Sequence, residues 1–261
     1  MYVVEIDEEL FIVDSGLMFP EGEMLGIDIV IPDISYIEEN KERVKGIFLT
    51  HGHEDAIGSI AYLSQKVQAP VYGSKLTIAL AKEHLKEMPA PPGIKFFEVT
   101  NKSRMNFERT HVTFFNTKHS IPDSLGIVFN TSEGAIVHTG EFKFDQAAKG
   151  KYRPDIAKMA ALGEQGVFIL MSDSSEAERP GYTTSESVIE THLSKTFHSA
   201  EGRILVALYA SNFIRIQQVF DTAVESGKKV AVVGKSLESY FEVGMRLGYL
   251  TIEDDIVIPV Q

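Results

Sequence analysis

The distribution of apolar residues predicts alternating strands and helices in the first part of the chain. Mostly apolar stretches at 2–6 and 10–13 lie on either side of an acidic turn, which is typical of a β-hairpin. An apolar run then ends at Thr50. Apolar residues at helical spacing begin near Ile57, and the region 57–85 predicts two helices with a short strand between them. This alternation indicates an α/β layer architecture.

The middle of the chain contains apolar runs at short intervals, which favours antiparallel strands. These strands are predicted at 94–99, 112–116, 125–130 and 135–138, with another strand at 167–171. A polar stretch at 174–181 indicates a domain boundary. Beyond it the pattern predicts a βα series with a parallel sheet, namely a helix capped by Thr183 and Glu186, strands at 204–208 and 230–233, and helices at 213–225 and 237–247.

The composition is that of an ordinary globular chain of 261 residues, long enough for one large domain or two smaller ones. A formal net charge of -12 argues against a general electrostatic grip on nucleic acid, so any RNA contact is expected to be local. Because there is no cysteine, a metal site must use histidine, aspartate or glutamate. No apolar run approaches the roughly 20 residues that span a bilayer. We therefore expect a cytoplasmic protein with no membrane partner.

The residues after the strand that ends at Thr50 are the strongest candidates for chemistry. His51, His53 and Asp55 occur at alternate positions, directly before the helical pattern that starts near Ile57. Imidazole nitrogens and a carboxylate oxygen on one short loop can converge on a single transition-metal ion. Zinc is the first candidate for that ion.

The segment Thr-His-Gly-His-Glu-Asp at 50–55 resembles the His-x-His-x-Asp-His motif of the metallo-β-lactamase superfamily, and within it the ribonuclease J branch. The resemblance implies that His51 and His53 bind a first metal ion, whereas Asp55 belongs to a second. The last histidine of the motif falls on Ala56, which cannot bind a metal. The second metal site is therefore expected to be damaged.

Two later segments resemble further ribonuclease J motifs. The segment Thr-Lys-His-Ser-Ile-Pro-Asp-Ser at 117–124 implies that His119 is the third histidine of the first metal site. The segment His-Thr-Gly-Glu-Phe-Lys-Phe-Asp at 138–145 has Glu141 where the family has an aspartate that bridges two metals. The resemblance implies one set of metal-binding and catalytic residues: His51, His53, Asp55, His119 and Glu141.

The same resemblance implies two supporting residues and one RNA contact. Asp14 falls on an aspartate that supports the metal loop from behind, although by itself it is equally a turn residue. His138 is expected to brace the site without binding metal. Ser211 falls on a group that contacts a terminal phosphate of RNA in the β-CASP domain. The pair Ser211 and Asn212 also suits a helix N-cap, and both roles are compatible.

We therefore expect an incomplete metallo-β-lactamase αββα domain at 1–173, followed by part of a β-CASP α/β domain at 174–261. Compared with a ribonuclease J, the chain is expected to lack a strand before Met1. It is also expected to lack the rest of the β-CASP domain and two catalytic histidines beyond Gln261. In a complete family member, two zinc ions would activate a water that attacks the RNA phosphorus.

The resemblance implies a nuclease that combines endonuclease and 5′ to 3′ exonuclease work in RNA maturation and decay. Because Ala56 and Glu141 both alter metal ligands, the chain resembles the catalytically weak paralogue that some Gram-positive bacteria carry. We expect at most one weakly bound zinc or manganese ion. The chain would then act as a subunit beside an active paralogue, in a hetero- or homo-oligomer. A non-catalytic RNA-binding scaffold and a small-molecule hydrolase of the same fold remain open, and the β-CASP-like part disfavours the second.

Overall fold

The computed structural model describes residues 1–145, 148, 150–253 and 255–259, and it divides into two compact units. The first unit contains residues 1–117, 123–142 and 154–174. The second unit contains residues 118–122, 143–153 and 175–261. Each unit has its own cluster of buried apolar side chains.

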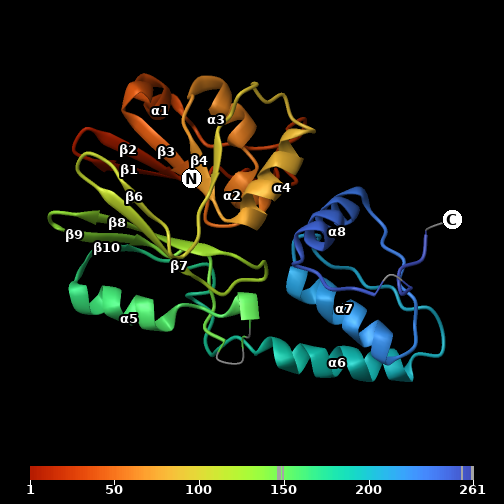
Figure 1. Ribbon diagram of the computed structural model, residues 1–261. Helices are drawn as coiled ribbons and strands as arrows, with labels where there is room; N and C mark the ends of the chain where they lie inside the picture. Colours follow the sequence, from red (N-terminus) through yellow and green to blue (C-terminus); the bar gives the residue numbers. More distant parts are fainter. Residues whose placement is uncertain (146–147, 149, 254, 260–261) are drawn as a thin grey trace. The chain divides into compact units, whose positions relative to one another are not determined.

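The first sheet of the first unit contains five described strands (Figure 1). Their order is β1 (Tyr2–Ile6), β2 (Glu9–Val13), β3 (Val44–Phe48), β4 (Val71–Gly73) and β5 (Phe96–Glu98). The strands β1 and β2 form the predicted antiparallel hairpin, and the other neighbours are parallel. The prediction of antiparallel pairing is wrong for β5. Helix α4 (Lys75–Leu85) precedes it, and a helical crossover returns the chain in the same direction as β4.

The second sheet also contains five described strands. Their order is β10 (Val167–Met171), β9 (Gly134–His138), β8 (Leu125–Thr131), β7 (His111–Asn116) and β6 (Arg104–Asn106). The predicted antiparallel pairing is confirmed for β7, β8 and β9. Strand β10 instead lies parallel to β9, because helix α5 (Ile156–Gln165) crosses between them.

The two sheets face each other across one apolar core. Phe11 and Phe48 from the first sheet pack with Phe114 and Phe129 from the second, and all four side chains are at most 1% exposed. Val128 directly precedes Phe129 in β8, so its side chain points to the opposite face of the sheet, where it packs against α5.

Helices cover the outer face of each sheet (Figure 1). On the first sheet these are α1 (Ser35–Glu39), α2 (Glu54–Ile57), α3 (Ile60–Lys66) and α4. A 3₁₀ turn at Lys41–Arg43 belongs to the first unit, and another at Gly150–Tyr152 belongs to the second. Helix α5 covers the second sheet. These layers form the predicted αββα sandwich.

The second unit contains helices α6 (Glu186–Ser199), α7 (Phe213–Glu225) and α8 (Lys235–Leu247), close to their predicted bounds. The predicted cap at Thr183 is wrong. Helix α6 is capped by Ser185, whose hydroxyl accepts a hydrogen bond from the backbone N–H of Ser187. Among the described residues of both units, no helix has both the length and the apolar character needed to cross a bilayer.

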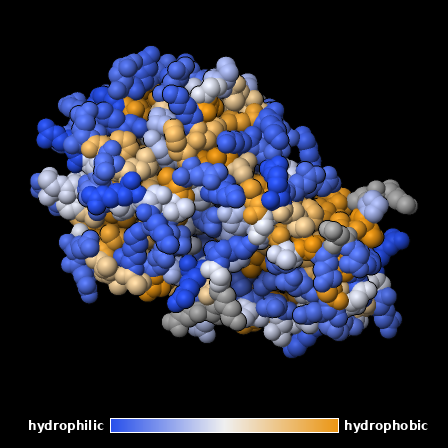
Figure 2. All heavy atoms as spheres, viewed as in Figure 1, coloured by the Kyte–Doolittle hydropathy of each residue, from blue (hydrophilic) through white to orange (hydrophobic). Residues whose placement is uncertain are grey.

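The predicted strands at 204–208 and 230–233 do not form a ladder among the described residues. Val230 makes one isolated parallel bridge with Val257. Ile204, Leu208 and Val230 pack against α6 and α7, whereas Leu205 is 95% exposed. The helices therefore cover one side of these segments, and the predicted parallel strand pairing is not found among the described residues. The two segments line an apolar groove of about 900 Å³, and hydrophobic side chains are visible on the surface of this unit (Figure 2).

Candidate metal centre

Parallel pairing brings the ends of β2 and β3 to the same edge of the first sheet. Val13 pairs with Phe48, so Asp14 and Thr50 follow their strands side by side. The carbonyl of Thr50 accepts a hydrogen bond of 2.8 Å from the N–H of Leu125, at the start of β8. The sheet edges that carry the predicted ligand loops therefore meet at Thr50.

The turn after β2 forms backbone hydrogen bonds with the first residues of α2. Ser15 N–H donates to the carbonyl of Ala56 at 2.7 Å, and Leu17 N–H donates to the carbonyl of Glu54 at 3.0 Å. Between them, a Cβ atom on Gly16 would lie 1.5 Å from the carbonyl oxygen of Asp55. Only glycine allows the two backbones to approach this closely.

Four predicted ligands can offer their donor atoms to one metal ion. Each of these residues supplies one imidazole nitrogen or carboxylate oxygen, and the four atoms all lie within 4.8 Å of one another; the residues are His51, His53, His119 and Glu141. His51 is buried, whereas the other three are partly exposed. The fold thus gathers residues that lie up to 90 positions apart in the sequence.

This donor set fits zinc or a similar divalent ion. Zinc takes imidazole nitrogen and carboxylate oxygen at roughly 2.0–2.2 Å, so ligands placed tetrahedrally around one ion lie about 3.3 to 3.6 Å apart. The four donor atoms need only a small contraction to reach that spacing. Three nitrogens and one oxygen suit zinc, which is a borderline-soft ion, better than calcium or magnesium, which prefer oxygen ligands.

A chain of hydrogen bonds orients His51. The Thr50 hydroxyl lies 2.9 and 3.1 Å from the two carboxylate oxygens of Asp14, and 2.8 Å from Nδ1 of His51. An ionised Asp14 can only accept, so the hydroxyl donates to it and accepts from Nδ1–H. The proton of His51 is then on Nδ1, which leaves the lone pair on Nε2 for a metal.

Asp14 is held against Thr50 at the start of the ligand loop, and its role of supporting a metal site stays a prediction. Its backbone has a φ of 58°, and its carboxylate also accepts the N–H of Thr50 at 2.8 Å. Burial raises the pKa of Asp14 to about 7, despite the hydrogen bonds from Thr50 that lower it. Its charge state therefore changes near neutral pH when no metal is bound.

Asp55 lies beside this group of ligands, although it is not part of it among the described residues. Its Oδ1 is 3.7 Å from Nε2 of His51. Partial burial and the adjacent carboxylate of Glu141 raise the pKa of Asp55 to about 6. Since the Asp55 side chain is 54% exposed, we attribute the shift mainly to Glu141. Its role as a metal ligand stays a prediction, as does the damage at Ala56, which is buried.

His138 lies at the end of β9 and is buried. Its Nδ1 accepts the N–H of Gly140 at 3.1 Å, and its ring lies edge-on to Tyr2. Burial lowers the pKa of His138 to about 4, so the ring is neutral at pH 7. It therefore orders the turn that leads to Glu141, and its role of bracing the metal site stays a prediction.

Ser211 belongs to the second unit, two residues before α7. Asn212 caps this helix, because its Oδ1 accepts the N–H of Arg215 at 3.0 Å. The Asn212 part of the N-cap interpretation is therefore confirmed. The contact between Ser211 and an RNA phosphate stays a prediction.

Sequence reasoning missed Thr50 and a buried group of charged residues in the second unit. Lys118 is 2% exposed, and burial together with nearby Lys143 lowers its pKa to about 8, against the opposing effect of Glu186 and Asp145. The sequence signal for this buried group was Lys118 itself, a charged residue directly before the predicted ligand His119. Periodicity alone could not show which acidic residues lie opposite it.

Comparison with known families agrees with the fold. The family model described as "Metallo-beta-lactamase superfamily" matches residues 1–189, which is more than half of the chain. The chain belongs to the metallo-β-lactamase superfamily. A second family model, described as "Ribonuclease J, beta-CASP domain", matches residues 201–261. This superfamily member thus continues into part of a β-CASP domain.

Curated relatives named Ribonuclease J 2 are similar to the whole of this superfamily member. The protein from Staphylococcus aureus is 58% identical over 260 residues, and that from Staphylococcus saprophyticus is also 58% identical over 260 residues. Each alignment covers 100% of this chain and 47% of the relative. The chain therefore spans about half the length of the curated relatives it matches.

A solved structure supports the same fold. The crystal structure of a protein of unknown function from Enterococcus faecalis V583 superposes with a TM-score of 0.68 at 13% sequence identity. The match covers 98% of this chain and 69% of the other. At this identity the likeness shows the fold alone.

Proposed function

We propose that this chain forms part of a ribonuclease J-type RNA nuclease with weakened metal chemistry. The observation that carries the proposal is the group of His51, His53, His119 and Glu141, which offers one ion four donor atoms. The nuclease assignment is supported by relatives named Ribonuclease J 2 at 57–58% identity. The match of residues 201–261 to the ribonuclease J β-CASP domain counts against a small-molecule hydrolase.

The residues of the chain have separate tasks in this proposal. A zinc or manganese ion in the group would polarise a phosphoryl oxygen and offset negative charge that develops on it. Asp14 and Thr50 hold His51 in the tautomer that presents Nε2. Without metal, Asp55 takes up a proton below about pH 6, where its pKa lies, because of its partial burial and the adjacent carboxylate of Glu141.

We expect at most one zinc or manganese ion per chain, bound weakly. Ala56 offers no donor atom, and Asp55 with Glu141 alone is too small a set for a second ion. The test is elemental analysis of the complete gene product, together with hydrolysis of a 5′-monophosphorylated RNA. Less than one ion per chain and slow cleavage are expected. Two tightly held ions with fast cleavage would overturn the proposal.

We also expect association with an active paralogue in the cytoplasm. A formal net charge of -12 disfavours broad contact with RNA, so a partner would supply much of the RNA-binding surface. Affinity purification from native extract, at low and moderate salt, should recover the paralogous chain. Recovery of this chain alone at both salt concentrations would contradict the expectation.

A non-catalytic RNA-binding scaffold is the second candidate function. The absence of a donor at Ala56 and the lengthened carboxylate at Glu141 favour it. RNA binding that is unchanged by a chelator, with no cleavage at any metal concentration, would support the scaffold over the nuclease.

A further inference from the structure

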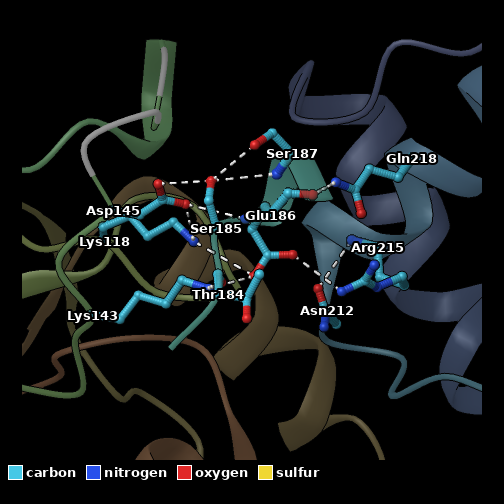
Figure 3. A network of polar contacts seen from close by, with 10 residues as sticks. All are labelled: Lys118, Lys143, Asp145, Thr184, Ser185, Glu186, Ser187, Asn212, Arg215 and Gln218. Atoms are coloured by element: carbon cyan, nitrogen blue, oxygen red, sulfur yellow. Dashed lines mark hydrogen bonds and ion pairs between the residues drawn. The ribbon is translucent and has the colours of Figure 1, made fainter. Parts of the chain in front are cut away.

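Glu186 lies at the centre of a network of ion pairs in the second unit (Figure 3). Its carboxylate is 2.8 Å from Nζ of Lys143 and 3.1 Å from Nη2 of Arg215. It is also 3.9 Å from Nζ of Lys118. One acidic side chain at the first position of α6 thus faces three cations.

Asp145 completes the surroundings of Lys118. Its carboxylate lies 3.9 Å from Nζ of Lys118, accepts the Ser185 hydroxyl at 3.0 Å, and accepts the N–H of Glu186 at 3.4 Å. The side chains of Lys118 and Asp145 are 2% and 4% exposed. Water screens such charges poorly, so a buried lysine needs opposing carboxylates to remain charged.

Backbone hydrogen bonds tie the same segments together. Lys143 N–H donates to the carbonyl of Lys118 at 2.9 Å. Ile214 N–H, in the first turn of α7, donates to the carbonyl of Ser120 at 3.4 Å. The segment 118–122 is therefore held from both sides, with His119 inside it.

Two of the cations that face Glu186 lie next to predicted metal ligands in the sequence. Lys118 directly precedes His119, and Lys143 follows Glu141 by two residues. The side chain of Glu186 is not used to cap its helix, because Ser185 has that role. We propose that Glu186 is a positioning residue, which fixes the segments carrying His119 and Glu141 so that both ligands meet one metal ion. This inference rests on the proposed metal-dependent function.

The decisive variant is Glu186→Gln, which keeps the shape of the side chain and removes its charge. The matched control is Glu190→Gln on the same helix, since Glu190 is exposed. Zinc affinity is measured on the complete gene product by competition with a chromophoric chelator, and the visible spectrum of the Co²⁺ form reports ligand geometry. Unfolding in EDTA measures stability without metal.

Glu186→Gln should weaken zinc binding about tenfold or more, as loss of residues that orient ligands does. Its Co²⁺ bands should shift, whereas Glu190→Gln should match the parent. Glu186→Asp should recover part of the affinity, because it restores the charge. A folded Glu186→Gln protein with the affinity and spectrum of the parent would overturn the inference.

Two further measurements keep the test decisive. If Glu186→Gln does not fold, Lys143→Gln replaces it, because Lys143 is 23% exposed and its loss leaves the Arg215 pair in place. This variant should also weaken zinc binding, and parental affinity would overturn the inference. A parent protein that binds neither zinc nor Co²⁺ would instead overturn the proposed metal-dependent function.

Discussion

The hydroxyl of Thr50 lies 2.8 Å from Nδ1 of His51 and connects that ring to the buried carboxylate of Asp14. This relationship selects the tautomer in which Nε2 of His51 can bind a metal. The residue that prepares the ligand is thus its neighbour in the sequence. Its action depends on Asp14, which follows a different strand.

Replacement of Thr50 by valine should weaken zinc binding about tenfold to a hundredfold, because the oriented hydrogen bond to His51 is lost. Thr50→Ser keeps the hydroxyl and should remain close to the parent. Chelator competition measures both affinities. Equal affinities for Thr50→Val and Thr50→Ser would show that the hydrogen bond does not orient the ligand.

Asp14 should make the stability of the metal-free protein depend on pH. Its pKa is raised from 3.8 to about 7 in the folded state, so the folded protein binds more protons than the unfolded chain between these values. Stability from this group is therefore lost as pH rises from about 4 to about 7. The full effect is on the order of 4 kcal/mol, since one pKa unit corresponds to about 1.4 kcal/mol.

Asp14→Asn isolates this effect, because an amide resembles the protonated carboxyl and tolerates the positive φ at this position. Urea unfolding in EDTA should show the variant gaining stability relative to the parent as pH rises through that window. A constant difference between the two proteins over the window would mean that the pKa of Asp14 is not raised.

Gly16→Ala should destabilise the protein by roughly 2 kcal/mol or more, because the added methyl group has no room beside the backbone of Asp55. Gly22→Ala is the matched control, since a Cβ there meets no atom within 4 Å. Urea unfolding compares the two variants. Similar stabilities would show that the turn after β2 can move away from α2.

The combination of Ala56→His and Glu141→Asp should raise zinc content and the rate of RNA hydrolysis in the complete gene product. The pair adds an imidazole and returns the carboxylate to the length found in the family motif. Ala56→Leu with Glu141→Asp controls for the added bulk at a buried position. Elemental analysis and cleavage of a 5′-monophosphorylated RNA are the measurements, and zinc content equal to that of the control would contradict the prediction.

Local patterns in the sequence determined most of the secondary structure. The two apolar stretches of the β1 and β2 hairpin and the helical spacing of α4 and α7 depend on neighbours in the chain, so they are visible without a fold. The candidate ligands were also visible, because His51, His53 and Asp55 stand together on one short loop.

Tertiary structure decided how these parts meet. Whether β5 pairs parallel or antiparallel depends on the crossover through α4, which strand spacing alone does not show. Ser185 rather than Thr183 caps α6, and Glu186 faces three cations instead of closing a capping box. The reason is physical, because hydrogen bonds and ion pairs depend on distances in space, and residues far apart in the sequence supply the partners.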